Sequence, residues 1–290
     1  MILIDYSQVA ISNIAVQLAM SKDKNVLSVP MVRHMILNSI RGYIHRFKSE
    51  YPGEIVICVD GPDPWRRDIF EQYKAKRREG RNNDDKDWES VFGLIHTIKE
   101  EIRDNFPYKV VQLDKVEADD IIAVICKKNH GKKILIISGD KDFQQLQKYP
   151  DVFQYSPIQK KYIETDSPQE YIYEHILRGD TSDGVPNFLS PDDTFVNKIK
   201  QKPVSKKKLA GWIDSLMRGN DPQDFCNEYH YRNYQRNQRL IDFDFIPDEL
   251  ENDIYNEYQE AEITVANRSK ILPYLINNDL KELIGKIEEF

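Results

Sequence analysis

Short apolar runs that alternate with longer amphipathic stretches constrain the fold of this chain most. The runs with the character of buried strands are Ile2–Ile4, Glu54–Val59, Lys109–Val111 and Ile134–Ile137. Helical patterns lie between them over Pro30–Phe47, Trp88–Arg103 and Asp119–Lys128. Strands that alternate with helices in this way form parallel sheets covered on both faces. We therefore predict an α/β fold with a central, largely parallel sheet flanked by helices.

The pattern changes after about Gly179, where strand signals fade. Helical patterns then follow over Lys206–Met217, Asp248–Tyr258, Ser269–Ile276 and Leu280–Ile287. We expect an α/β domain over residues 1–178, with an edge hairpin over Tyr155–Ile163, and a smaller helical domain over residues 179–290. Residues 63–87 are rich in Arg, Lys and Asn and too long for a plain strand-to-helix turn, so we interpret them as a functional excursion.

Composition narrows the class of protein. With 290 residues and 40% hydrophobic content, the chain can bury a large core. No run approaches the roughly 18 apolar residues of a membrane span, and the first residues lack the pattern of a signal peptide. We expect a soluble cytoplasmic protein without membrane contact. The three cysteines and six histidines lack the spacing of metal ligands, so neither a zinc site nor a histidine-based mechanism is expected.

Acidic residues recur where predicted strands end. Asp5, Asp60 and Asp140 stand at or just after such ends, and ligands of parallel α/β sheets bind at that edge. The further acids are Asp142, Glu117, Asp119, Asp120, Asp180 and Asp183. Carboxylates repel each other, so a fold that gathers them favours a bound divalent cation. Oxygen ligands without His or Cys favour Mg²⁺ or Mn²⁺, and a pair of such ions catalyses phosphodiester hydrolysis.

Each acidic motif also has a plainer interpretation. Asp142 could cap a helix over Phe143–Gln147, and the acids of Glu117–Asp120 could complement the start of the helix that follows. The pair Asp180 and Asp183 could belong to a turn with side-chain caps. Three acids in four positions, however, exceed what a helix start needs. We therefore favour metal ligation for the set as a whole.

Two basic segments flank these acids in the sequence. Arg66–Arg81 holds seven basic residues against three acids, and Lys198–Lys208 holds six lysines and no acid, although the formal net charge is −7. Beside a metal cluster, such cations and the rings of Trp65 and Tyr73 suit a track for a single nucleic-acid strand. The expected contacts there are Arg66, Arg67, Tyr73, Lys74, Arg77 and Arg78. Lys198, Lys200, Lys206, Lys207 and Lys208 are expected on a duplex backbone. Ordinary solvated surface charge is the alternative.

These motifs together resemble the 5′ nuclease family of flap endonucleases. The resemblance rests on Leu3-Ile4-Asp5, Val59-Asp60, Tyr73-Lys74-Ala75-Lys76-Arg77, Glu117-Ala118-Asp119-Asp120, Gly139-Asp140-Lys141-Asp142 and Gly179-Asp180-Thr181-Ser182-Asp183-Gly184. Within the family it is most similar to the ribonuclease H branch of T-even bacteriophages, through Ile4-Asp5-Tyr6-Ser7-Gln8, Met31-Val32-Arg33-His34, Tyr149-Pro150 and Leu240-Ile241-Asp242-Phe243-Asp244. The likeness spans nearly the whole chain.

The resemblance implies a 5′ to 3′ exonuclease and flap endonuclease on RNA:DNA and DNA duplexes. Such an enzyme removes the RNA primers of lagging-strand fragments during phage DNA replication, as a monomer in the cytoplasm of the infected bacterium. Single-stranded DNA-binding protein and the sliding clamp are its candidate partners. The family uses two Mg²⁺ ions, which Mn²⁺ can replace.

The resemblance also assigns roles to residues. Asp5, Asp60, Asp119 and Asp140, with Glu117 and Asp120 in the same motif, would hold the first metal. Asp142, Asp180 and Asp183 would hold the second. Residues 63–87 would form an arch for a 5′ single strand, and Lys74 and Arg77 would contact the reacting phosphate. Pro186–Asp193 lacks the glycines of the family's duplex-binding hairpin, so no potassium site is expected and the lysine-rich segment takes that contact.

Two other classes of function remain open on the residues alone. A small-molecule phosphohydrolase with an aspartyl nucleophile would use Asp5, although such enzymes place a second Asp where Ser7 stands. A non-catalytic, structure-specific nucleic-acid binder would keep the basic segments and use the acids only structurally. Release of phosphate from nucleotides would favour the first, and metal-independent binding without cleavage would favour the second.

Overall fold

The computed structural model describes residues 1–21, 26–82, 84, 86–262 and 265–290. Its strands are β1 (Ile2–Asp5), β2 (Ile55–Cys58), β3 (Lys109–Val111), β4 (Ile134–Ile137), β5 (Val152–Ser156) and β6 (Lys161–Ile163). They form one sheet in the order β3-β2-β1-β4-β5-β6. All neighbours pair in parallel except β5 and β6, which are antiparallel. The predicted fold class, a largely parallel sheet flanked by helices, is confirmed.

The sheet is built around β1. Ile4 lies opposite Ile57 of β2 and Ile137 of β4, so the carboxyl ends of these three strands are level with one another. The side chains of β1, β2 and β4 are buried on both faces of the sheet, as expected for parallel strands covered by helices. The expected hairpin at Tyr155–Ile163 forms. Its first strand begins earlier, at Val152, and pairs with β4 as well as with β6, so of the two hairpin strands only β6 is at an edge of the sheet.

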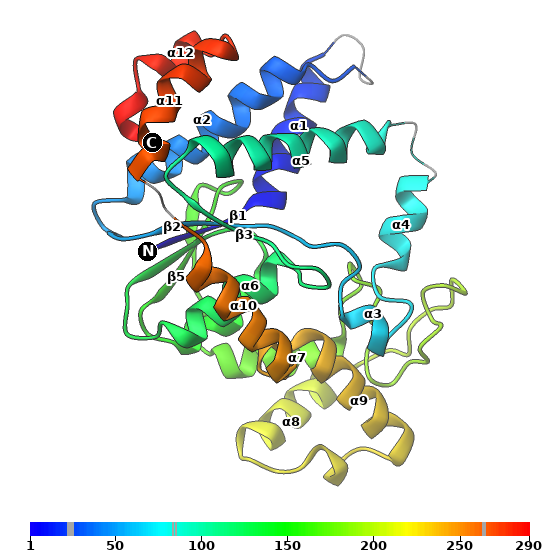
Figure 1. Cartoon of the computed structure of the whole chain (residues 1–290). Coiled ribbons are helices and arrows are strands. Elements are labelled where there is room, and N and C mark those ends of the chain that lie inside the picture. Colours follow the sequence, from blue (N-terminus) through cyan, green and yellow to red (C-terminus); the bar gives the residue numbers. More distant parts are fainter. Residues whose placement is uncertain (22–25, 83, 85, 263–264) are drawn as a thin grey trace.

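Helices cover both faces of the sheet (Figure 1). One face is covered by α1 (Tyr6–Met20), α2 (Val29–Phe47) and α5 (Trp88–Asn105). The other face is covered by α6 (Ala118–Lys128) and α10 (Asp248–Glu260). Helix α1 had no counterpart in the sequence pattern because its exposed positions carry apolar residues such as Val16 and Met20, which hide the amphipathic contrast. It begins directly at Asp5, whose side chain accepts a hydrogen bond from the backbone N–H of Gln8.

The predicted excursion over residues 63–87 contains two short helices, α3 (Arg66–Ile69) and α4 (Ala75–Asn82). Its residues 83 and 85 lie outside the described part of the chain. In Figure 1, α4 stands to one side of the sheet, between α3 and the start of α5. The segment before α4 is anchored, because Trp65, Phe70 and Tyr73 are buried and the backbone N–H of Lys74 donates to the carbonyl of Asp183.

The remaining helices are α7 (Pro168–Arg178), α8 (Lys206–Met217), α9 (Glu228–Ile241), α11 (Val265–Asn277) and α12 (Lys281–Ile284). Helices α7, α8 and α9 share a separate hydrophobic core that includes Ile176, Phe188 and Tyr234. The chain then returns to the sheet, because Ile254 of α10 and Leu275 of α11 belong to the two cores that flank it. The division at residues 178 and 179 stays a prediction, since residues on both sides share cores. Among the described residues, no helix combines the length and apolar character needed to cross a bilayer.

Candidate metal centre

Acidic side chains from separate segments converge at the carboxyl edge of the sheet. Burial, together with the carboxylates of Asp60 and Asp140, raises the pKa of Asp5 to about 7. Burial and the charges of Asp140, Asp5 and Glu117 raise the pKa of Asp119 well above its usual range. Burial is the larger cause of both shifts, and the contributions of the neighbouring carboxylates reflect their closeness to one another. We call Asp5, Asp60, Glu117, Asp119 and Asp140 the first acid group.

Backbone geometry fixes the members of this group. Asp5 caps α1 and accepts a hydrogen bond from the Ser138 hydroxyl at 2.9 Å. Asp60 accepts the backbone N–H of Ala118 at 2.9 Å, so the end of β2 is tied to the start of α6. Asp140 accepts the backbone N–H of Asp142 at 3.0 Å and caps a 3₁₀ helix over Lys141–Lys148. The alternative that Asp142 is the cap is therefore wrong, and its carboxylate is free for another role.

A second acid group, Asp142, Asp180 and Asp183, lies beside the first. Burial raises the pKa of Asp142 to about 7; His175 opposes that shift, while Asp140, Asp180 and Asp183 add to it. Asp140 therefore contacts both groups electrostatically. Asp180 follows a sharp turn at Gly179, where φ is +67° and a Cβ atom would come within 2.4 Å of the Val185 carbonyl oxygen. Only glycine fits there, and it directs the chain from α7 back toward the sheet.

His175 of α7 is a member of the site that sequence reasoning missed. Its Nδ1 lies 3.3 Å from an Asp142 oxygen and its Nε2 3.7 Å from an Asp180 oxygen. The helix that carries it was not predicted, and a lone histidine five positions before an aspartate matches no ligand spacing. The spacing of the histidines in the sequence therefore did not reveal that one of them lies among the acids. The available signal was the apolar repeat Ile172 and Ile176, which places His175 at a helix end just before Gly179.

Asp120 does not behave as a metal ligand here. It is fully buried, and Arg66 donates to its two oxygens at 2.7 and 2.9 Å. The Trp65 indole N–H and the backbone N–H of Glu117 also donate to it, each at 3.1 Å. Three of these bonds fall on one oxygen and the fourth, from Arg66, on the other, so protein donors compensate the carboxylate and the placement of Asp120 among the ligands is corrected. Its role is to hold α6 and the base of the excursion together.

Arg66, Trp65 and Tyr73 likewise face inward rather than toward a nucleic acid. Arg66 is 3% exposed and also binds Glu117 and the carbonyl of Leu240. The Tyr73 hydroxyl lies 3.0 Å from both Glu117 and Asp183. Residues this buried cannot contact phosphates or stack on bases. The expected nucleic-acid contacts of Arg66, Trp65 and Tyr73 are therefore corrected to supporting contacts beneath the acids.

Lys74 and Arg77 lie over the acids from the side of α4. The Lys74 ammonium is 2.5 Å from Glu117 and 3.5 Å from Asp183, and Arg77 is 2.5 Å from Asp183. Burial lowers the pKa of Lys74, but Glu117 and Asp183 outweigh it and raise the pKa above its usual value. Both side chains therefore stay cationic next to the place where a phosphate would meet the acids.

The other predicted nucleic-acid contacts lie farther out. Arg67 pairs with Asp63 at 3.1 Å, and Arg78 donates to the carbonyl of Tyr73. Lys198 is exposed and reaches Glu79 of α4 at 3.8 Å. The remaining lysines are exposed: Lys200, Lys206, Lys207 and Lys208. Lys206 begins α8, which is seen at the bottom of Figure 1. Their role stays a prediction.

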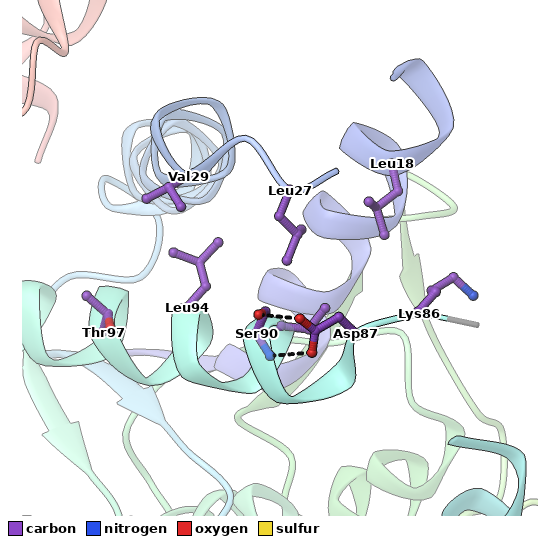
Figure 2. Close-up of a pocket in the computed structure, with 9 residues that line it drawn as sticks. Leu18, Leu27, Val29, Lys86, Asp87, Ser90, Leu94 and Thr97 are labelled. Atoms are coloured by element: carbon purple, nitrogen blue, oxygen red, sulfur yellow. Dashed lines mark hydrogen bonds between the residues drawn. The ribbon is translucent and has the colours of Figure 1, made fainter. Parts of the chain in front are cut away.

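Two hollows differ in what they could bind. One of about 700 Å³ is lined by residues of both acid groups and by His175, with Lys141, Tyr171 and Arg178 at its rim. Another, of about 470 Å³, lies between the end of α1, the start of α2 and α5; Figure 2 shows its apolar lining of Leu18, Leu27, Val29 and Leu94. Asp87 there only caps α5 through Ser90. The chemistry belongs to the acid-lined hollow.

The donor set fits a divalent cation. Three acids with raised pKa values, Asp5, Asp119 and Asp142, repel neighbouring carboxylates that a cation would neutralise. The ligand atoms of Asp142, His175 and Asp180 lie within 4.8 Å of one another. Oxygen-rich sites of this kind at the carboxyl edge of a parallel sheet, with cations facing them, are typical of enzymes that act on phosphate esters.

Comparison with known proteins agrees with this class. The model of the 5′-3′ exonuclease N-terminal resolvase-like domain matches residues 1–175, and that of the T4 RNase H C-terminal domain matches residues 166–290. The chain therefore belongs to the 5′-3′ exonuclease family. The ribonuclease H of Enterobacteria phage T4 is 37% identical over 297 residues, which cover 99% of this chain and 95% of that protein.

Solved structures share the fold. A zinc-bound structure of the phage T5 5′-exonuclease matches with a TM-score of 0.61 at 15% identity, over 90% of this chain and 98% of that one. A complex of the bacteriophage T5 D15 flap endonuclease with DNA and metal ions matches with a TM-score of 0.60 at 16% identity, over 89% of this chain and 99% of that one. The relatives are named as phosphodiester hydrolases, and this chain is an enzyme of the same class.

Proposed function

We propose that this nuclease acts as a 5′ to 3′ exonuclease and flap endonuclease that removes RNA primers from lagging-strand fragments during phage DNA replication. Its substrates would be DNA and RNA:DNA duplexes with 5′ single-stranded ends. The observation that carries the proposal is the convergence of two acid groups at one sheet edge, directly beneath two cations of the excursion. Anions and cations so arranged suit metal ions and a phosphate between them.

Two Mg²⁺ ions would be held by the two acid groups, with Mn²⁺ as a substitute. Asp5, Asp60, Asp119 and Asp140, near Glu117, would hold one ion, and Asp142, Asp180 and Asp183 the other. Bound there, the ions would supply the positive charge that activates a water and stabilises the leaving oxygen of a phosphodiester. Asp140 is the central residue, because its charge acts on members of both acid groups.

Lys74 and Arg77 would act on the substrate itself. In the described structure they pair with Glu117 and Asp183, which are members of the two acid groups. Once metal ions neutralise those carboxylates, the ammonium and guanidinium groups can donate to phosphate oxygens instead. They would then stabilise the charge that develops on the reacting phosphate, within an arch formed by residues 63–87.

The duplex would lie on the exposed lysines of residues 198–208. Lys198, Lys200 and Lys206–Lys208 carry five cations without a salt bridge shorter than 3.8 Å among the described residues. Contacts of this type bind the phosphate backbone without reading its sequence. We propose a monomer as the active form, with single-stranded DNA-binding protein and the sliding clamp as partners during replication.

The test is digestion of end-labelled substrates. A 5′-flapped DNA duplex and an RNA-primed DNA duplex are incubated with the wild-type protein, with and without Mg²⁺, and product lengths separate exonuclease from flap cleavage. We expect cleavage of both substrates only with the metal. Asp140→Asn should abolish cleavage while substrate binding remains, and Asp114→Asn, at an exposed acid between β3 and α6, should cleave normally. Metal-independent cleavage, or full activity of Asp140→Asn, would contradict the proposal.

A further inference from the structure

The side chain of His175 is unusual among the groups at the acid edge, because it is a nitrogen donor among oxygens. It projects from the last turn of α7 into the hollow that holds Asp140, Asp142 and Asp180. Its side chain is 15% exposed, close to the values of Asp142 and Asp180. A histidine between two carboxylates is either an internal counter-ion or a metal ligand. The contacts of its two ring nitrogens distinguish these roles.

The Nδ1 atom is buried and has no hydrogen-bond partner anywhere in the part of the chain that the structure covers. It lies 3.3 Å from an Asp142 oxygen without forming a hydrogen bond to it. Without a metal, the charge of the nearby Asp142 compensates this nitrogen, and a cation bound between the two would use the nitrogen directly. Ligands about 2.0–2.2 Å from one ion are separated from each other by roughly 3–3.5 Å. The spacing of Nδ1 and the Asp142 oxygen is therefore that of two neighbouring ligands.

The other ring nitrogen faces a carboxylate at a distance slightly longer than a hydrogen bond. Nε2 faces an Asp180 oxygen at 3.7 Å, and the other Asp180 oxygen is held by the backbone N–H groups of Ser182 and Asp183. Metal-binding histidines commonly direct the second ring nitrogen to a carboxylate, which fixes the tautomer and the ring orientation. The backbone bonds keep Asp180 in place for this task, and Gly179 sets the turn that carries it.

We infer that His175 is a ligand of the second metal ion, through Nδ1, and that the second site is therefore a mixed nitrogen and oxygen site. This inference rests on the proposed two-metal function. An imidazole raises the preference for borderline ions such as Co²⁺ and Zn²⁺ over Mg²⁺, and Mn²⁺, an oxygen-preferring ion, gains little from it. The first acid group offers only oxygens and keeps the preference for Mg²⁺. The two sites of this enzyme would thus differ in metal preference.

The test measures metal binding without substrate. Mn²⁺ is added to the protein at a fixed neutral pH, and pulsed electron paramagnetic resonance detects the hyperfine coupling of a nitrogen bound directly to the ion. We expect this coupling in the wild type, a changed coupling when the histidines carry ¹⁵N, and its loss in His175→Gln. His45→Gln is the matched control, because His45 is an exposed histidine on α2.

Calorimetric titrations give the affinities. We expect His175→Gln to weaken Co²⁺ binding at one site by at least about 10-fold and Mg²⁺ binding by less than about 3-fold, because only the borderline ion gains from the imidazole. His45→Gln should match the wild type for both ions. Two bound Mn²⁺ ions without nitrogen coupling would overturn the inference about His175 but not the proposed two-metal function. A Co²⁺ affinity of His175→Gln equal to that of the wild type would have the same consequence. A wild-type protein that binds no Mn²⁺ would overturn the proposed two-metal function as well.

Discussion

Neighbouring acids at the start of α6 should respond in opposite ways to the same substitution. Asp119 belongs to the first acid group, where its charge is repelled by Asp140, Asp5 and Glu117. Asp120 is fully buried and bound by Arg66 and Trp65. Replacing each by Asn removes one negative charge at almost the same place in the chain. The comparison thus separates the metal-binding role that we propose for Asp119 from the structural role of Asp120.

The expected loss in Asp120→Asn is one of stability. The change leaves the Arg66 guanidinium buried with a weakened partner, although Glu117 and the carbonyl of Leu240 still accept from it at 3.0 and 2.8 Å. Breaking a buried ion pair by removing one partner costs about 3–5 kcal/mol, and the two remaining bonds favour the lower end. We expect the free energy of unfolding to fall by about 3 kcal/mol, while folded protein at 20 °C retains cleavage activity.

The expected loss in Asp119→Asn is one of activity. Without metal, removing a repelled carboxylate should leave the protein as stable as the wild type or more so. Cleavage of a 5′-flapped duplex should fall by at least about 100-fold, because a proposed ligand of the first metal is lost. Urea unfolding in the presence of a chelator gives the stabilities, and cleavage assays in Mg²⁺ give the activities. An inactive Asp120→Asn of wild-type stability would refute the structural role that we assign to Asp120.

Three further predictions follow from the same geometry. Lys74→Gln should lower kcat for flap cleavage by roughly 10²–10³-fold, because a cation next to the reacting phosphate is lost; the control Lys76→Gln, at an exposed lysine against Phe195, should change it little. Stability of the metal-free protein should rise when the pH falls from 8 to 6. Burial and nearby carboxylates raise the pKa of Asp5 to about 7, and burial and other acids, opposed by His175, do the same for Asp142. An acid with a raised pKa binds a proton in the folded chain that the unfolded chain has already released. The free energy of unfolding therefore declines as the pH rises from about 4 to 7, by up to about 1.4 kcal/mol per pH unit for each group. Chelator-treated protein that unfolds at a lower urea concentration at pH 6 than at pH 8 would contradict this prediction. Gly179→Ala should cost more stability than Gly219→Ala. Both glycines have positive φ, but only at position 179 would the added Cβ atom come within 2.5 Å of backbone atoms, and thermal unfolding of the two variants measures the difference.

Much of the fold could be predicted from the sequence because parallel strands are short and apolar on both faces. The predicted strand Ile134–Ile137 has the bounds of β4. The carboxyl ends of β1, β2 and β4 lie side by side, as we expected from the acids that follow these strands in the sequence. Helices α1 and α9 could not be predicted in the same way. Helix α9 buries Asn233, Arg236 and Asn237, whose partners are carbonyls and acids far away in the sequence, so its buried face is polar.

The acids of the site could be named from the sequence, but which of them line the site and which bind other side chains could not be predicted. Asp119 and Asp120 are adjacent and chemically identical, and only the packing of Arg66 and Trp65 separates them. Because of the same packing, Arg66, which we expected to contact nucleic acid, instead forms an internal ion pair with Asp120. His175 was missed because its relation to Asp142 depends on how α7 packs on the 3₁₀ helix after β4, a tertiary contact that no local pattern contains.

The backbone bond from Lys74 to Asp183, at 2.7 Å, joins the base of α4 to the loop of the second acid group. Gly184 lies against the carbonyl of Gln72 in the same junction, so the two segments have little freedom to shift independently. A bound nucleic-acid strand that fixes the position of one segment must also restrict the other segment. If substrate and metal ions bind at these segments as proposed, their affinities are linked thermodynamically, and each ligand should raise the affinity for the other by the same factor.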